Sequence, residues 1–360
     1  MATSKLASGL DQSSHSVLSV QHLISKQHIS SVPQQFVRLD QEPLASAFSA
    51  SLPTIPTIDM NQLLSDEAGA DSNEVEKLFS VCKEWGLFQL VNHGVSDSLL
   101  EKLKQDTEGF FQLPLDEKVK YRKPDDFEGY GNHILSDDQK LDWGDRFYMV
   151  TNPVHKRKPH LFPELPSSLR STLESYIEEL QKISIKLLGL LAIGLKVEPR
   201  EVVELFEDGM QSMRIGYYPP CPQPELVMGI SAHTDGTGIT ILNQVNGVNG
   251  LQLKKDGVWI PVNALSNALL VNIGDVLEIM SNGIYKSVEH RARVNCKEER
   301  ISIAMFFYPK FESEISPLTS LTNPNNPPLF KRIGMENYLK GFFSHLVTGK
   351  SHLEHLRIKH

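Results

Sequence analysis

S-A-H-T-D-G, at residues 231–236, is the stretch from which the fold and the site of this chain can be predicted. Residues two apart in a β-strand point to the same face, so His233 and Asp235 can both reach one cation. A second stretch, S-V-E-H-R at residues 287–291, supplies His290 from a further strand. Two imidazoles and one carboxylate occupy one face of a metal ion and leave the opposite positions open, as in non-haem Fe(II) oxygenases. The pattern therefore predicts a metal centre made of these three side chains.

E-R-I-S-I-A-M-F, at residues 299–306, follows with the same two-residue step. It places the guanidinium of Arg300 beside the hydroxyl of Ser302, and such a pair suits the carboxylate of a co-substrate. Taken alone, the pair is more often a surface feature of an edge strand. Because it follows His290 by only ten residues, we predict an anchor for a co-substrate that carries a carboxylate.

The two stretches are expected to form one pocket. Only a short polar turn separates residues 285–294 from residues 300–308, which predicts a hairpin. In its simplest register His290, Ser302 and Phe306 project from the same face. The metal and the carboxylate anchor would then lie side by side.

The metal ligands alone leave the chemistry open. One H-x-D or H-x-E is weak in a chain with 13 His and 44 acidic residues, and a second match stands at His352 and Glu354. We interpret that match, with His355, as part of an exposed tail. The absence of thiolates from the site argues against structural zinc, whereas a catalytic zinc hydrolase would also use two His and one acid. The Arg-x-Ser step favours Fe(II), a 2-oxo acid and O2.

Composition narrows the class of protein. The 360 residues can bury a large core, and the net charge of -8 argues against nucleic acid and anionic membranes as partners. The most apolar run, residues 183–195, is shorter than a membrane span, and residues 1–11 lack the pattern of a secretory signal. The few scattered cysteines predict reduced thiols in a cytoplasmic protein; they are Cys82, Cys221 and Cys296.

The chain is expected to fold into mixed α and β structure in four parts. These are a loosely attached polar arm (1–50) with a short helix at 19–26, a mainly helical region (51–205), a β-rich core (206–312), and a C-terminal loop, helix and tail (313–360). The longest helical pattern covers residues 166–196. Eight short strands predict a two-sheet jelly roll or barrel, at residues 213–218, 226–233, 238–245, 250–254, 258–262, 268–273, 285–294 and 300–308.

Several further stretches resemble one family. They are I-P-T-I-D (55–59), C-K-E-W-G-L-F-Q-L-V-N-H-G-V (82–95), F-F-Q-L-P-L-D-E-K (110–118), L-D-W-G-D (141–145) and Y-Y-P-P-C-P-Q-P (217–224), besides H-T-D and R-I-S. With these motifs the chain resembles the plant 2-oxoglutarate/Fe(II)-dependent dioxygenases of specialised metabolism, most of all their senescence-related and codeine O-demethylase-like branch. The resemblance covers about residues 50 to 345.

The resemblance implies a double-stranded β-helix (jelly roll) flanked by helices. It also implies Fe(II), 2-oxoglutarate and O2 as reaction partners, with ascorbate supporting activity. The implied reaction is hydroxylation or O-demethylation of a small flavonoid, alkaloid, steroid, terpenoid or related metabolite, with release of succinate and CO2. A monomer in the cytoplasm, with the nucleus as a second compartment, is expected.

The motifs also imply roles for single residues. His233, Asp235 and His290 match the family's iron ligands, and Arg300, Ser302 and Tyr218 match its 2-oxoglutarate contacts. Residues that correspond to substrate contacts in flavonoid-oxidising relatives are Arg146, Tyr148, Arg214, Phe306 and Tyr308. Two departures from the family pattern are Gly216, where relatives usually have Asn, and Asn243, where an apolar residue is usual.

Two alternatives remain open from the sequence. One is an oxidase of the same fold that does not use 2-oxoglutarate, as in the ethylene-forming enzymes. The other is a binding protein that has kept the fold and lost activity. The intact His233, Asp235, His290 and Arg300 set argues against the second alternative.

Overall fold

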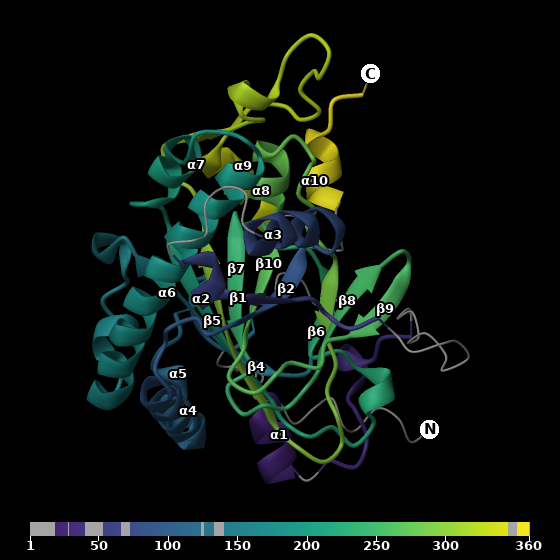
Figure 1. Ribbon diagram of the computed structural model, residues 1–360. Helices are drawn as coiled ribbons and strands as arrows, with labels where there is room; N and C mark the ends of the chain where they lie inside the picture. Colours follow the sequence, from purple (N-terminus) through teal and green to yellow (C-terminus); the bar gives the residue numbers. More distant parts are fainter. Residues whose placement is uncertain are drawn as a thin grey trace.

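Two β-sheets form the centre of the molecule, and each combines strands from distant parts of the chain (Figure 1). The computed structural model describes residues 19–27, 29–39, 53–65, 73–123, 126–132, 140–344 and 351–359. Within these ranges the larger sheet has eight strands in the order β1-β2-β10-β7-β12-β5-β4-β3, and the smaller sheet has four in the order β6-β11-β8-β9. This arrangement matches the mixed α and β jelly roll that the strand pattern predicts.

All neighbours in the larger sheet are antiparallel except β1 and β2, which are parallel. Its strands are β1 (Thr57–Asp59), β2 (Leu87–Val91), β3 (Gly129–Tyr130), β4 (Asp145–Asn152), β5 (Gln211–Tyr218), β7 (Ile239–Asn243), β10 (Leu269–Ile273) and β12 (Arg300–Phe307). The smaller sheet consists of β6 (Ile230–His233), β8 (Leu251–Lys255), β9 (Val258–Pro261) and β11 (His290–Ala292). A short ribbon is formed by β13 (Glu314–Ile315) and β14 (Ile333–Gly334).

The predicted hairpin between residues 285–294 and 300–308 is wrong. β11 pairs with β6 and β8 in the smaller sheet, whereas β12 pairs with β5 and β7 in the larger one. β11 and β12 follow each other in the chain but lie in different sheets, so the short connection does not make them partners. Their side chains nevertheless meet, because the two sheets face the same cavity.

The larger sheet separates an apolar core from this cavity. Successive side chains of a strand point to opposite faces. One set packs into the main core with α6 and has no exposed surface; it includes Met213 and Ile215 of β5 and Ile301, Ile303 and Met305 of β12. The alternate set lines the cavity; it includes Arg214 and Tyr218 of β5 and Arg300, Ser302, Ala304 and Phe306 of β12.

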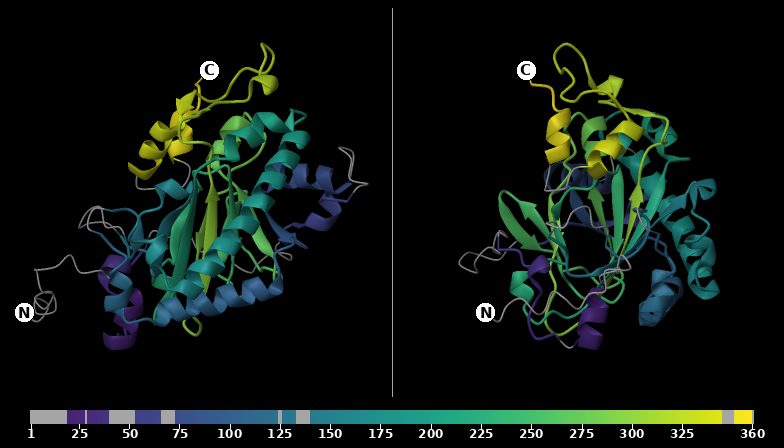
Figure 2. Two further views of the ribbon diagram at one scale, coloured as in Figure 1. Left: turned by 90° about the vertical axis from the view of Figure 1, so that its left-hand side faces the viewer. Right: turned by 180° about the vertical axis from the view of Figure 1, so that it is seen from behind.

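Helices cover the outer face of the larger sheet, and the long α6 runs across it (Figure 2). The α-helices are α1 (Val20–Gln27), α2 (Met60–Leu63), α3 (Asn73–Glu84), α4 (Asp97–Gln112), α5 (Leu115–Val119), α6 (Ser167–Gly194), α7 (Pro199–Phe206), α8 (Asp275–Met280), α9 (Met335–Ser344) and α10 (Ser351–Leu356). Short 3-10 helices lie at η1 (Gln34–Phe36), η2 (Val154–Lys156), η3 (Phe162–Glu164), η4 (Pro224–Leu226) and η5 (Thr319–Leu321). Within the described ranges, no helix combines the length and the apolar character that crossing a bilayer requires.

Most of the expected elements are present, but α5, α7, α8 and α10 were not predicted individually, and the expected exposed tail contains α10 with the buried Leu353. The helix predicted at residues 166–196 is α6, and each of the eight predicted strand segments contains a strand. The sequence did not predict α8, a helix of six residues that are all buried. A helix buried on every side has no apolar stripe, and periodicity therefore cannot reveal it. The division of the chain into four parts stays a prediction.

Residues 19–27 and 29–39 are firmly packed, so the prediction of a loosely attached arm is wrong for this segment. Val20 and Phe36 have no exposed surface, and the ring of Phe36 packs edge-on against Trp143 with ring centroids 5.2 Å apart. The hydroxyl of Ser19 and the backbone amide of Val20 both donate to the buried carboxylate of Asp145 at 2.6 Å. The short helix predicted at 19–26 is confirmed as α1.

Replacing Phe36 with Ala tests this packing. Truncation of a fully buried aromatic side chain leaves a cavity, and we expect the free energy of unfolding to fall by about 3–5 kcal/mol. Urea unfolding of the purified protein measures the change. Leu39→Ala serves as the control, because Leu39 is 82% exposed and its loss is expected to change stability by less than about 0.5 kcal/mol. Equal stability of the two variants would contradict a packed arm.

Candidate metal centre and its cavity

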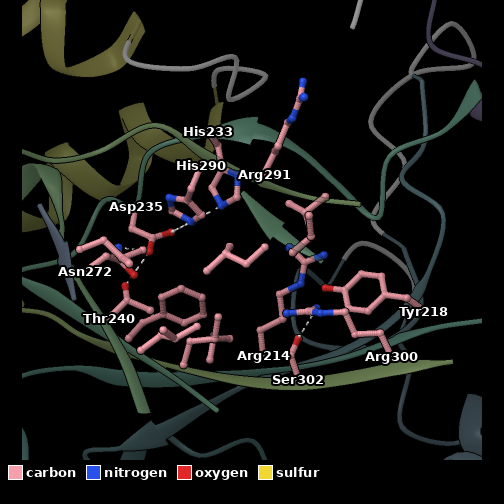
Figure 3. A pocket seen from close by; sticks show the side chains of 18 residues that line it. Arg214, Tyr218, His233, Asp235, Thr240, Asn272, His290, Arg291, Arg300 and Ser302 are labelled. Carbon is pink, nitrogen blue, oxygen red and sulfur yellow. Dashed lines mark hydrogen bonds and ion pairs between the residues drawn. The ribbon is translucent and has the colours of Figure 1, made fainter. Parts of the chain in front are cut away.

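Three side chains converge where β6 meets β11. His233 ends β6, Asp235 follows two residues later, and His290 begins β11 directly opposite His233. The Nε2 atoms of His233 and His290 lie 3.6 and 3.8 Å from the same oxygen, Oδ1 of Asp235. One nitrogen or oxygen of each residue lies within 4.8 Å of the others, so one metal ion can contact all three. Figure 3 shows the two rings and the carboxylate turned toward one point.

Backbone carbonyls set the orientation of both imidazoles. Nδ1 of His233 lies 2.8 Å from the carbonyl oxygen of Ser231, and Nδ1 of His290 lies 3.1 Å from that of Val288. A carbonyl oxygen can only accept, so Nδ1 carries a proton, and the neutral form of each ring presents the lone pair of Nε2 to the centre. The same contact, to the residue two positions earlier, holds both rings.

The carboxylate of Asp235 is equally well held. Its Oδ2 accepts hydrogen bonds from the Thr240 hydroxyl at 2.7 Å and the Asn272 side-chain amide at 2.8 Å, which leaves Oδ1 to face the two rings. Burial alone would raise the pKa of Asp235, but the His290 and His233 imidazoles and the hydrogen bonds lower it well below its usual value. The centre thus offers an ionised carboxylate and two imidazole nitrogens, a donor set that fits a divalent iron ion.

A cavity of about 610 Å³, part of it open to solvent, contains the metal centre. Much of its wall is apolar, formed by Leu87, Ile230, Leu242, Leu251, Leu270, Ala292, Ala304 and Phe306. Asp235 is the one acidic residue among those that line it. Such a cavity suits a small molecule with a largely apolar body and a few polar contacts.

A buried guanidinium lies in the same cavity. Arg300 is 2% exposed, and its terminal nitrogens donate to the Ser302 hydroxyl and to Oε1 of Gln244, both at 3.1 Å. Burial lowers the pKa of Arg300, and its Nε has no hydrogen-bond partner among the described residues. A buried cation that contacts only neutral groups is favourable when an anion joins it. Arg300 and Ser302 therefore provide a site for a carboxylate.

The ring of Tyr218 lies beside Arg300, with Cζ of the guanidinium 5.2 Å from the ring centroid. Three glycines make room for this ring. A Cβ atom on Gly144, Gly216 or Gly229 would lie 2.8, 2.5 or 3.0 Å from the nearest atom of Tyr218. The atom nearest to residue 216 is the Tyr218 hydroxyl oxygen. Gly216, the departure from the family pattern, thus lets the tyrosine hydroxyl occupy the space where another side chain would begin.

Two family models match the chain. The model of the 2OG-Fe(II) oxygenase superfamily matches residues 209–309, and the N-terminal model of the non-haem dioxygenases in morphine synthesis matches residues 55–165. The chain belongs to the 2-oxoglutarate/Fe(II)-dependent oxygenases. Together the two models cover more than half of the chain, and the resemblance inferred from the motifs is confirmed.

Several known proteins are similar to this oxygenase over more than nine-tenths of its length. It is 49% identical to codeine O-demethylase of Papaver somniferum, over 98% of both chains, and 48% identical to protein SRG1 of Arabidopsis thaliana, over 95% and 96%. It is 46% identical to oxoglutarate-dependent flavonoid 7-O-demethylase 1 of Ocimum basilicum, over 93% of this chain and 90% of that one. The crystal structure of JOX2 in complex with 2OG, Fe and JA superimposes with a TM-score of 0.86 at 34% identity, over 96% and 98%. The fold, the enzyme class and the use of Fe(II) and 2-oxoglutarate are thereby established.

The residues proposed as substrate contacts fall into three groups. Arg214 and Phe306 line the cavity. Arg146 and Tyr148 lie on the next strand, opposite Gly216 and Arg214, so they share the cavity face but stand one strand farther away. Tyr308 follows the end of β12 and is buried. Contact of these residues with substrate stays a prediction.

Asn243, the second departure from the family pattern, is not among the residues lining the cavity. It pairs with Ile303, which belongs to the core side of the larger sheet. Two residues that support the site, Gln244 and Asn272, were missed by sequence reasoning. Asn272 had a signal in the sequence, because it is the one polar residue in the otherwise apolar run at 268–273.

The L-D-W-G-D segment connects the N-terminal arm to the metal centre. Oδ1 of Asp142 accepts hydrogen bonds from the amide and the hydroxyl of Ser231, at 3.1 and 2.5 Å, and from Arg38 at 3.4 Å. The carbonyl of the same Ser231 orients the ring of His233. Nε1 of the neighbouring Trp143 donates to the carbonyl of Pro219 at 3.1 Å, next to Tyr218. Asp142 is therefore a positioning residue for His233.

Replacing Asp142 with Ala is expected to weaken metal binding by roughly tenfold, the lower end of what the loss of a supporting contact costs at a metal site. Titration of the metal-free protein with Mn(II), followed by electron paramagnetic resonance, measures the dissociation constant. Asp256→Ala is the control, since the side chain of Asp256 is 88% exposed. An unchanged dissociation constant in the Asp142 variant would show that β6 holds His233 without this contact.

Proposed function

We propose that His233, Asp235 and His290 hold the Fe(II) ion, and that Arg300, Ser302 and Tyr218 bind the distal carboxylate of 2-oxoglutarate. The observation that supports this assignment most strongly is the presence of both groups in one cavity. A three-ligand cation site and a buried guanidinium with no acidic partner in the described chain are the two features that a chelating dicarboxylate requires. The hydrolytic chemistry of a zinc hydrolase does not require the second feature.

Each supporting side chain has a definite task in this proposal. The carbonyls of Ser231 and Val288 fix a proton on Nδ1 of each imidazole, so that Nε2 is the nitrogen available to the ion, while Thr240 and Asn272 direct one Asp235 oxygen toward it. Bound Fe(II) supplies the activation of O2 that oxidises 2-oxoglutarate to succinate and CO2 and leaves one oxygen atom for the substrate.

The cavity wall has two further tasks. Arg300 and Ser302 neutralise and orient the co-substrate, because charged hydrogen bonds fix its carboxylate in one position. The apolar wall, with Phe306 and Leu242, limits water and presents the carbon–hydrogen bond to be attacked.

The substrate we propose is a small plant metabolite of the flavonoid, alkaloid, steroid or terpenoid type. The names of the similar proteins support it, since they include O-demethylases named for codeine, thebaine and a flavonoid. Hydroxylation of a carbon–hydrogen bond is the basic reaction. On an O-methyl carbon it gives a hemiacetal, which collapses to formaldehyde and the free hydroxyl, so the net result is O-demethylation.

We also propose that the protein acts as a monomer in the cytoplasm, with the nucleus as a second compartment. The net charge of -8 supports the exclusion of nucleic acid and anionic membrane partners. Ascorbate is expected to support activity by keeping the iron reduced. Size-exclusion chromatography with light scattering tests the oligomeric state.

His233→Ala is expected to reduce succinate formation to background while the protein stays folded, because two of the three ligands cannot hold iron in the same way. The assay combines Fe(II), ascorbate, 2-oxoglutarate and a plant metabolite extract, with mass spectrometry for gains of oxygen or losses of CH2. His155→Ala is the matched control, since His155 is exposed and far from the centre in the sequence. Extract-dependent oxidation without succinate would instead favour the oxidase that does not use 2-oxoglutarate.

Gly216→Asn is expected to raise the dissociation constant of 2-oxoglutarate by roughly tenfold, the cost of one lost hydrogen bond to a charged group. The new side chain takes the space of the Tyr218 hydroxyl and displaces it. Calorimetry with the Mn(II)-loaded protein under argon measures the constant. Gly247→Asn is the control, because Gly247 has open space around it and a φ of +71° that Asn tolerates. Tighter binding in the Gly216 variant would contradict the role given to Tyr218.

A further inference from the structure

Three arginines line the cavity, and two of them have clear partners. Arg291 donates to Oε1 of Gln252 at 2.8 Å and its guanidinium lies 4.0 Å from the centroid of the Trp259 ring, so its side chain points away from the cavity, as Figure 3 shows. Arg300 is held by Ser302 and Gln244. Arg214 differs from both, because it forms no hydrogen bond or ion pair with any residue that the structure describes, and its Nε is buried.

The position of Arg214 is fixed by the alternation of β5. It shares the cavity face with Gly216 and Tyr218, while its neighbours Met213 and Ile215 face the core. Figure 3 shows its side chain extending into the cavity beside Tyr218. Its charged neighbour on the adjacent strand is another cation: burial and the proximity of Arg214 lower the pKa of Arg146 to about 9. Like charges thus meet here. The carboxylate of Asp142 also acts on Arg146, but it is bound by Ser231 and Arg38.

The charges of the loaded site leave Arg214 uncompensated. Fe(II) brings two positive charges and Arg300 one, while Asp235 and the 2-oxoglutarate dianion bring three negative charges. These groups cancel one another. Of the two other arginines that line the cavity, Arg291 is turned away onto Trp259, so Arg214 is the positive charge left facing the largely apolar walls. A partly buried guanidinium without an acceptor is costly, and the cost disappears when an anionic oxygen pairs with it.

We propose that Arg214 binds an acidic oxygen of the substrate, either a carboxylate or an ionised phenol. The proposal rests on the function proposed above and narrows its substrate class to acids with an apolar skeleton. Pairing with Arg214 fixes one end of the molecule, so the carbon that reacts is the one that then reaches the metal centre. Ile230, Leu242 and Phe306 provide the apolar surface for the rest of the skeleton.

Matched pairs of probes test this assignment. The first pair is 4-methoxycinnamic acid and its methyl ester; the second is 4′-hydroxy-7-methoxyflavone and 4′,7-dimethoxyflavone, measured above the pKa of the phenol. The protein is loaded with Mn(II) and 2-oxoglutarate under argon, so that Arg300 is occupied and no turnover takes place. Calorimetry then gives the dissociation constant of each probe. The first pair tests a carboxylate as the ligand and the second a phenolate.

We expect the acidic member of at least one pair to bind about 10-fold to 100-fold more tightly than its neutral partner, the range for a hydrogen bond to a charged group. Arg214→Met keeps the apolar stem and removes the charge, and it is expected to abolish this preference. Arg214→Lys is expected to retain part of it. The dissociation constant of 2-oxoglutarate is expected to stay unchanged in both variants.

Three results would overturn the inference. They are equal or tighter binding of the neutral members, absence of binding by both acids, and a loss of 2-oxoglutarate binding in Arg214→Met, which would assign Arg214 to the co-substrate. Arg300→Met separates this outcome from a failure of the proposed function. If that variant keeps normal 2-oxoglutarate affinity, the co-substrate site is wrong, whereas an unchanged acid preference in Arg214→Met refutes only the inference about the substrate.

Discussion

The alternation of side chains between the core face and the cavity face of the larger sheet is the constraint on which the rest of this structure depends. Every second residue of β5 and β12 is buried in the main core, and this burial fixes the strands in one register. The intervening residues must then face the cavity. Arg214, Tyr218, Arg300 and Ser302 are placed together because their neighbours are apolar. A shift of either strand by one residue would turn its apolar side chains toward the cavity and its polar side chains toward the core.

The same alternation explains what could be predicted from the sequence. The R-x-S step revealed which side chains share a face of β12, and the H-x-D step revealed two neighbouring side chains although Asp235 lies beyond the end of β6. The motifs around them revealed the family. The expected hairpin was wrong although the shared pocket was right. The face of a strand on which a residue lies is a local property, whereas the partner of a strand is set by the path of the whole chain. β11 and β12 meet across the cavity instead of along an edge.

The parts that escaped prediction are polar contacts between distant segments. Asp142 reaches Ser231 and Arg38, and Gln244 reaches Arg300, over separations of 56 to 104 residues. The single letters D and Q do not indicate such partners, because most residues of these types lie on the surface. The packing of the N-terminal arm was not predicted for a related reason. Its composition is polar, and only a few residues such as Val20 and Phe36 make the contact.

The ring of Tyr218 between three glycines limits how this enzyme can change during evolution. Gly144, Gly216 and Gly229 come from three separate segments. A Cβ atom on any of them would lie 3.0 Å or less from the same ring. Each glycine is constrained by the tyrosine, and the tyrosine by all three. A larger residue at position 216, such as the Asn that relatives usually have, requires the ring of Tyr218 to lie in a different position. Substitutions at these four positions should therefore be epistatic, so that the effect of each depends on the side chains present at the other three.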